Sequence, residues 1–228
     1  MLILLPPSEG KAVGGTGTWD PAGGRFGRQL AAPRRAVVKA LRSAGADRLS
    51  VRGDTAERAL LANAMLRASP ALPAHDRYTG IVFSHLEPST LKKAELRQAE
   101  QSIVVVTGLG GLFAFDDPVP EYRAPIGARL AGVGHLARFW AGHLGATVDA
   151  LANGQPVIDL LPQEHRKALR RGGPGWIEVD LVHRQQRGGH NAKAAKGLLA
   201  RALLGRGVTV LDEWEHQGWR ADWRILGE

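Results

Sequence analysis

The sequence contains no cysteine, and it has no apolar run long enough to cross a membrane. Without cysteine, disulfides, thiolate metal sites and cysteine nucleophiles are excluded. A membrane-spanning helix needs about 18 or more apolar residues in a row. The run from Met1 to Leu5 is too short for a signal peptide, and no basic segment precedes it. We therefore expect a cytoplasmic protein with no membrane association.

Several patterns that identify catalytic or metal-binding proteins are also missing. The eight histidines form neither HxxxH nor HExxH, and no nucleophile-elbow sequence surrounds a serine. The glycine-rich segment around Lys11 is not a Walker A loop, because Ala12 stands where Ser or Thr is needed. The sequence therefore predicts no dedicated metal site and no bound cofactor.

Positive charge is abundant and unevenly distributed. The net charge is +8 and the isoelectric point is about 10.4. Residues 25–52 hold eight basic side chains and one acid, and residues 164–206 hold ten basic side chains and three acids. Two basic segments of this kind favour a surface that faces a polyanion. The alternative is a GC-rich genome, whose codons favour arginine without any binding partner.

The pattern of apolar residues predicts one α/β domain over residues 1–228, compact, with a mixed sheet flanked by helices. The expected strands are 2–5, 80–84, 103–107, 156–161 and 176–182, and the expected helices are 32–44, 55–68, 89–100, 134–151 and 190–205, followed by a hairpin over 208–226.

The two helices expected nearest the N-terminus each have a predicted orientation. In helix 32–44, Arg34 and Arg35 fall on the polar side with Lys39 and Arg42. In helix 55–68, the apolar side carries Leu60, Leu61, Ala64 and Met65.

Two glycine-rich loops follow expected strands. Residues 6–15 contain Ser8, Gly10 and Lys11, a combination that presents backbone N–H groups and a cation to an anion. Residues 107–112 contain Thr107 and Gly108, and their glycines permit close approach of a ligand. Either loop could instead be an ordinary exit from a strand.

Two further segments carry polar side chains suited to a site. Residues 117–127 are too rich in proline for a helix and include Asp117, Tyr122 and Arg123. In helix 190–205, Asn191 is a suitable N-cap, and Lys193 and Lys196 share one face near the positive end of the helix dipole. The alternatives are a surface loop in which Arg123 pairs with nearby acids, and a solvated basic helix face.

These segments together resemble the YaaA family of peroxide stress resistance proteins. Four segments match family motifs in order. They are the apolar strand with the turn that follows it (3–11), the Tyr78-Thr79-Gly80 motif, the turn at 107–111 and the Tyr122-Arg123 pair. The matches continue through Phe139-Trp140 and Lys193 to Gly197, so the resemblance covers nearly the whole chain.

The resemblance implies a YaaA-like fold with a basic cleft, DNA binding and a role in limiting iron-driven damage during peroxide stress. A helix-hairpin-helix element is also ascribed to the family. The corresponding stretch here is 49–56, in which only Gly53 and Ala56 suit that pattern.

Three functional hypotheses follow. The first is a protein that binds double-stranded DNA without sequence preference. The second is an enzyme with a pocket for a nucleotide or another anionic small molecule, built from loops 6–15, 107–112, 117–127 and the helix start at 190–197. The third is a basic scaffold without a site.

The sequence nominates two overlapping sets of site residues. The candidate catalytic residues are Lys11, Asp117, Tyr122, Arg123 and Lys193. The candidate residues for DNA or anion binding are Ser8, Lys11, Arg52, Thr107, Gly108, Arg123, Asn191, Lys193 and Lys196.

Overall fold

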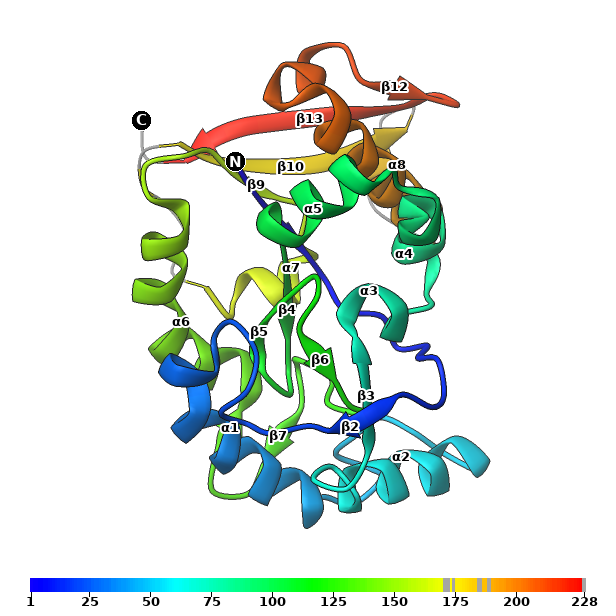
Figure 1. Ribbon diagram of the computed structural model, residues 1–228, viewed down its shortest axis with the longest axis vertical. Helices are drawn as coiled ribbons and strands as arrows, with labels where there is room; N and C mark the ends of the chain where they lie inside the picture. Colours follow the sequence, from blue (N-terminus) through cyan, green and yellow to red (C-terminus); the bar gives the residue numbers. More distant parts are fainter. Residues whose placement is uncertain (170–172, 174, 184–185, 188–189, 227–228) are drawn as a thin grey trace.

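A mixed β-sheet forms the centre of the protein (Figure 1). The computed structural model describes residues 1–169, 173, 175–183, 186–187 and 190–226. In spatial order, the sheet contains β12 (Glu215–His216), β13 (Trp219–Leu226), β10 (Trp176–His183), β9 (Val157–Asp159), β1 (Leu2–Leu5), β4 (Ile103–Thr107) and β5 (Gly111–Ala114), and β11 (Gln186–Arg187) pairs with β10.

The strands at the middle of the sheet are parallel, and those toward its edges are antiparallel. β1 runs parallel to β4 and β9, and β10 runs parallel to β9. β5 and β13 pair antiparallel with β4 and β10. The expected α/β class with a mixed sheet is thereby confirmed.

The two most apolar segments of the sequence form neighbouring central strands. Every residue of β1 and β4 is buried, and Ile3 lies opposite Ile103 in the parallel register. Strands covered on both faces require continuous apolar, often β-branched runs, which both segments provide. The strands expected at 2–5 and 103–107 are therefore confirmed.

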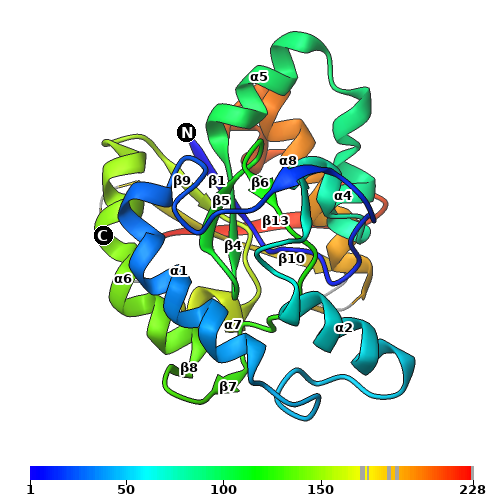
Figure 2. The ribbon, with the colours of Figure 1, turned by 60° about the horizontal axis from the view of Figure 1, so that its bottom comes forward.

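Helices lie on both sides of these strands. They are α1 (Gly27–Arg42), α2 (Asp54–Ala64), α3 (Ala74–Arg77), α4 (Ile81–Leu86), α5 (Lys93–Ser102), α6 (Leu136–Ala152), α7 (Gln163–Arg166) and α8 (His190–Arg206), with 3-10 turns η1 (Pro88–Thr90) and η2 (Val208–Asp212). In Figures 1 and 2, β1 and β4 lie between α6 on one side and α4 and α8 on the other. η2 occupies the start of the segment expected as a hairpin, and the hairpin itself is β12 and β13.

Two small sheets extend the domain beyond the main one. β2 (Thr16–Thr18), β3 (Pro70–Pro73) and β6 (Pro118–Val119) form one, and β7 (Arg129–Leu130) and β8 (Gly134–His135) form the other. The buried Arg77 side chain ties the first to the N-terminal loop by donating to the carbonyls of Val119, Pro70 and Gly14.

The strand expected at 80–84 is wrong, because these residues begin helix α4. A short apolar run does not distinguish a buried strand from a buried helix. Val82, Phe83 and Leu86 are buried, and α4 lies so close to α8 that a Cβ at Gly197 would stand 2.2 Å from the Val82 carbonyl oxygen. Packing against α8 therefore decided the conformation.

The orientation predicted for helix 55–68 is also wrong, and the one predicted for helix 32–44 holds except at Arg34. Arg34 is fully buried, and its guanidinium donates to the carbonyls of Gly110 and Leu112. In α2 the buried residues are Ala59 and Asn63, whereas Leu61 and Met65 are 65% and 50% exposed. In both helices a polar side chain takes an interior position because it bonds to backbone atoms there.

The parallel strands direct several loops to one edge of the sheet. β1, β4 and β9 all end at this edge, and β1 lies between the other two. After β4 the chain continues outward to β5, and after β9 it continues in the opposite direction to β10. Ligands bind in α/β proteins outside the carboxyl ends of strands where connections diverge in this way. The fold therefore places a candidate site beyond β1.

Candidate functional site

The turn after β1 folds back on itself and carries a lysine to the sheet edge. The Ser8 hydroxyl donates to the Gly10 carbonyl at 2.8 Å, and Lys11 Nζ donates to the Ser8 carbonyl at 2.9 Å. Gly80 packs against this turn, where a Cβ would stand only 2.2 Å from Ser8 Oγ. The Gly in the Tyr78-Thr79-Gly80 motif therefore allows the turn to approach closely.

The Lys11 amine lies against two aromatic rings. Its Nζ is 4.2 Å from the centroid of the Tyr122 ring and 5.8 Å from that of Tyr78. Burial lowers the pKa of Lys11 to about 7, and the positive charge of Arg123 contributes in the same direction. Lys11 can therefore both accept and donate a proton near neutral pH.

Below the lysine, two buried tyrosines share a hydrogen bond. The hydroxyl oxygens of Tyr78 and Tyr122 are 2.8 Å apart, and Tyr122 also bonds to the side chain of Thr107. Burial raises the pKa of Tyr122 to about 12 and that of Tyr78 well above its usual range. Both tyrosines therefore stay protonated and serve as neutral hydrogen-bonding groups.

Arg123 is held firmly from three directions. Its backbone N–H donates to Asn63 Oδ1 at 2.9 Å, and Asn63 Nδ2 donates to its carbonyl at 2.8 Å. The side-chain Nε donates to the Leu49 carbonyl, and Nη1 pairs with Glu9 Oε2 at 3.0 Å. The Arg123 side chain is 16% exposed, whereas that of Glu9 is 79% exposed. A firmly held cation thus pairs with a solvent-exposed carboxylate.

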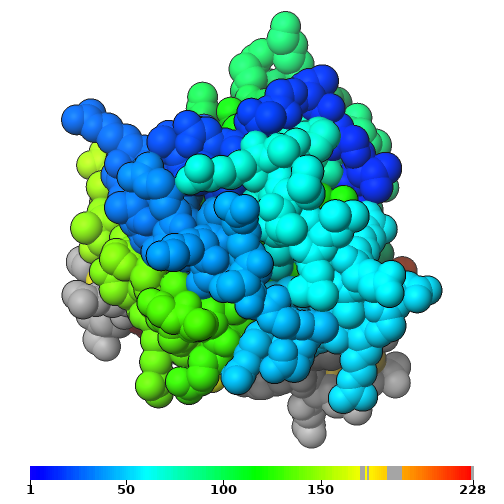
Figure 3. All heavy atoms as spheres, turned by 90° about the horizontal axis from the view of Figure 1, so that it is seen from below, coloured from blue at the N-terminus to red at the C-terminus, as the bar shows by residue number. Residues whose placement is uncertain are grey.

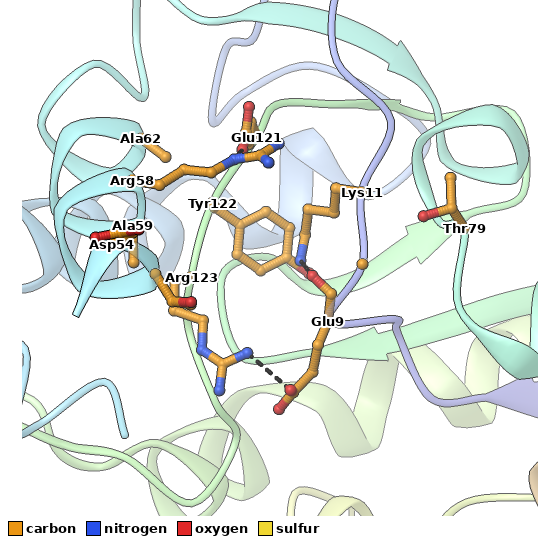
Figure 4. Close-up of a pocket in the computed structure, with 12 residues that line it drawn as sticks. Glu9, Lys11, Asp54, Arg58, Ala59, Ala62, Thr79, Glu121, Tyr122 and Arg123 are labelled. Atoms are coloured by element: carbon orange, nitrogen blue, oxygen red, sulfur yellow. Dashed lines mark hydrogen bonds and ion pairs between the residues drawn. The ribbon is translucent and has the colours of Figure 1, made fainter. Parts of the chain in front are cut away.

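These side chains line a hollow of about 460 Å³ (Figure 4). Lys11 and Tyr122 lie side by side at its centre, Arg123 reaches Glu9 on one side, and Arg58 and Glu121 lie on another. Arg58 pairs with Glu121 at 2.7 Å. Both arginines of this hollow are therefore ion-paired, Arg123 with the exposed Glu9 and Arg58 with Glu121, whereas Lys11 donates only to backbone carbonyls among the described residues.

Two further hollows continue from the first. One of about 190 Å³ shares Lys11, Tyr122 and Arg123 with it and extends to His165. The next, of about 330 Å³, shares Ser8, Glu9 and His165 with the second and reaches Lys193 and Lys196. Glu9 lines all three. We refer to the three together as the groove.

The far end of the groove is also basic. Lys196 Nζ donates to the Leu160 carbonyl, and burial lowers the pKa of Lys196 to about 8. Lys193 is exposed, and its charge is one of those that lower the pKa of Glu9, after the hydrogen bond from Arg123 and the charges of Arg123 and Lys11. Burial lowers the pKa of His165 to about 4, so this ring is neutral at physiological pH.

The structure places the other nominated residues outside the groove lining. Asp117 is 5% exposed and accepts from the backbone N–H groups of Arg25 and Ala114. Gly108 allows the backbone at Ala124 to pass close by, because a Cβ added at Gly108 would stand 2.2 Å from the Ala124 carbonyl oxygen. Arg52 is exposed on the loop before α2. The side chain of Asn191 lies outside the part of the chain that the structure describes.

Comparison with known proteins gives the family. The family model described as peroxide stress protein YaaA matches residues 1–222. The chain belongs to the YaaA family. It is 32% identical over 224 residues to a UPF0246 protein of Streptomyces coelicolor, covering 91% of this chain and 84% of that one. It is 30% identical over 211 residues to a UPF0246 protein of Corynebacterium efficiens, covering 89% and 84%.

The structure adds residues that line the groove or support it from beneath, and to which the YaaA-family resemblance assigns no role. Tyr78 belonged to a matched motif, and its sequence signal was the adjacent Thr79-Gly80. Glu9 lies inside the predicted 6–15 loop between Ser8 and Lys11, and its ion pair with Arg123 has no signal in the sequence. His165 and Asn63 carry no sequence signal, because their roles depend on contacts made across the fold.

Two features are absent from the described residues of this YaaA-family chain, a cluster of metal-binding side chains and a membrane-spanning helix. Within residues 1–169, 173, 175–183, 186–187 and 190–226, no group of three or more His, Asp or Glu side chains is arranged to hold a metal ion. No helix in the same residues combines the length and apolar character needed to span a bilayer.

Proposed function

We propose that this YaaA-family protein is an enzyme that binds an anionic small molecule, such as a nucleotide, in the groove. The observation that carries the proposal is the environment of Lys11. Its amine is bonded only to backbone carbonyls, lies on the Tyr122 ring, and has no carboxylate of the described residues within ion-pair distance. A buried cation left without a counter-ion favours a ligand that supplies one.

Lys11 and Arg123 would divide the chemical work. Arg123 is rigid and presents a planar guanidinium, which suits bidentate binding of a phosphate or carboxylate. Lys11, with a pKa near 7, would transfer a proton to or from the atom next to that anionic group. The protonated Tyr122 would hold the lysine in place rather than act as a base.

Arg123→Lys tests the binding role. Lysine keeps the charge but loses the planar fork, so affinity for AMP and for inorganic pyrophosphate should fall by about 1–3 kcal/mol. Arg97→Lys, on the exposed face of α5, is the matched control and should change neither affinity nor melting temperature. A large melting loss with unaltered affinity would show that Arg123 is structural.

DNA binding, with protection of DNA from iron-driven damage, is the second candidate. Arg28, Arg35, Lys39 and Arg42 are exposed on α1 at spacings of one helix face. Three of them line a shallow hollow of about 550 Å³ together with Arg67. α1 and α2 cover the face seen in Figure 3. This stripe is separate from the groove and suits the phosphates of a duplex.

Salt dependence tests this second candidate. Neutralising several phosphates should lower the logarithm of the duplex affinity by several units per decade of salt. Arg35→Gln with Arg42→Gln should reduce that slope by about 1–2 without changing the melting temperature. Binding that is undetectable at about 50 mM salt would reject the DNA role.

A further inference from the structure

The groove has a basic group at each end. Arg123 and Lys11 lie at one end, and Lys193 and Lys196 line the other. Within the described part of the chain, neither Lys193 nor Lys196 forms an ion pair with a carboxylate, and Lys196 bonds only to a backbone carbonyl. Among the described residues, Lys11 at one end and Lys193 and Lys196 at the other therefore have no carboxylate partner, and Arg123 is paired only with the exposed Glu9.

The carboxylate of Glu9 is stabilised by positive charges from both ends of the groove. Its carboxylate is bound to Arg123, and its pKa is lowered first by that bond and also by the charges of Lys11 and Lys193. Its side chain is 79% exposed, so water can replace its other contacts. Because cations from both ends stabilise the negative charge of Glu9, an anionic group of a ligand would be stabilised at the same position.

Resting on the proposed function, we infer that the ligand is a small molecule with an anionic group at each end. One group binds Arg123 and Lys11 in place of the Glu9 carboxylate, and the other binds Lys193 and Lys196. Nucleoside bisphosphates and sugar bisphosphates are the chemical class that fits this arrangement. The neutral His165 between the two ends would contact the uncharged centre of the molecule.

Calorimetric titration of the full chain with matched phosphates tests the inference. The probes are AMP beside adenosine 3′,5′-bisphosphate, and fructose 6-phosphate beside fructose 1,6-bisphosphate. The bisphosphate of at least one pair should bind about tenfold or more tightly than its monophosphate, the ratio expected for one added charge-assisted contact. In Lys193→Gln that preference should fall to about threefold or less.

Two further variants complete the test. Lys93→Gln, on the exposed surface of α5, is the matched control and should keep the preference. Glu9→Gln should strengthen binding of every probe by about tenfold or less, because the competing carboxylate is removed from Arg123. Weaker binding in Glu9→Gln would contradict the replacement step.

The outcomes separate the inference from the function on which it rests. Monophosphate binding that depends on Arg123, but without any preference for bisphosphates, keeps the proposed function and overturns the two-ended ligand. A bisphosphate preference that survives Lys193→Gln also overturns it. Absence of binding by all four probes overturns both.

Discussion

Two clusters of charge near the carboxyl ends of the central strands are balanced in opposite ways. Arg166 is 1% exposed and pairs with Asp159 at 3.4 Å, Glu178 at 3.5 Å and Asp180 at 2.8 Å. Burial alone would lower the pKa of Arg166, but these carboxylates raise it above its usual range. Around Lys11, burial and then the charge of Arg123 lower the pKa to about 7, although Glu9 and Glu121 act in the opposite direction.

The difference separates a structural cation from one that we propose is functional. Arg166 is surrounded by its own counter-ions, so its charge is used entirely within the fold. Lys11 contacts backbone carbonyls and an aromatic ring, and Glu9 and Glu121 act on it only from beyond ion-pair distance. An uncompensated buried charge costs stability and is retained where a ligand uses it.

Replacing each cation by an apolar side chain gives the largest expected contrast. Arg166→Leu removes the cation paired with the fully buried Asp159 and should cost about 3–5 kcal/mol of unfolding free energy. Lys11→Met removes a cation that is unfavourably buried, and should leave stability unchanged or raise it. Urea unfolding of both variants beside the parent measures the two effects. Equal losses in both would remove the distinction between the clusters.

Within the site, the tyrosine pair is expected to contribute the next largest effect. Tyr122→Phe keeps the ring under Lys11 but leaves the buried Tyr78 hydroxyl without its partner, at a cost of about 1–3 kcal/mol. The double variant with Tyr78→Phe should recover part of that loss, because no lone hydroxyl remains. Denaturant unfolding of the three variants completes the cycle. A simple sum of the single losses would mean that the two hydroxyls are not coupled.

The pH dependence of anion binding should show the smallest effect and assign it to Lys11. Sulfate keeps its charge near neutrality, so its affinity should fall about tenfold from about pH 6 to about pH 8 as Lys11 loses its proton. His165, with a pKa of about 4, does not titrate here, and Lys196, with a pKa of about 8, contributes only at the upper end. In Lys11→Met the fall should nearly disappear below about pH 7.5. An unchanged profile would assign the titration to another group.

The free energy of unfolding should rise with pH, whereas anion affinity falls, and it should do so over a higher pH range. Folding lowers the pKa of Lys11 from 10.5 to about 7, so the unfolded chain holds the extra proton between these values. Unfolding free energy from this group therefore rises with pH through that window, and its penalty is full below about pH 7. The anion should bind best where the free protein is least stabilised by Lys11.

The sequence by itself determined those elements whose residues are compatible with only one secondary structure. Residues 2–5 and 103–107 are apolar enough to form strands covered on both faces, and their loops carry Ser8, Lys11 and Thr107 to one sheet edge. It also determined that Tyr122 and Arg123 lie in a proline-rich segment that forms no helix. Local composition was sufficient at these positions.

Only the tertiary structure decided which polar groups share an environment. Arg34 and Arg35 are adjacent in sequence, yet Arg34 is buried on backbone carbonyls and Arg35 is exposed. The Tyr78–Tyr122 hydrogen bond joins residues that are 44 positions apart in the sequence. The hydrogen bonds between Asn63 and the Arg123 backbone join residues that are 60 positions apart. Such contacts depend on how distant elements pack, because the desolvation and neighbouring charge that lower the pKa of Lys11 come from side chains distributed along the chain.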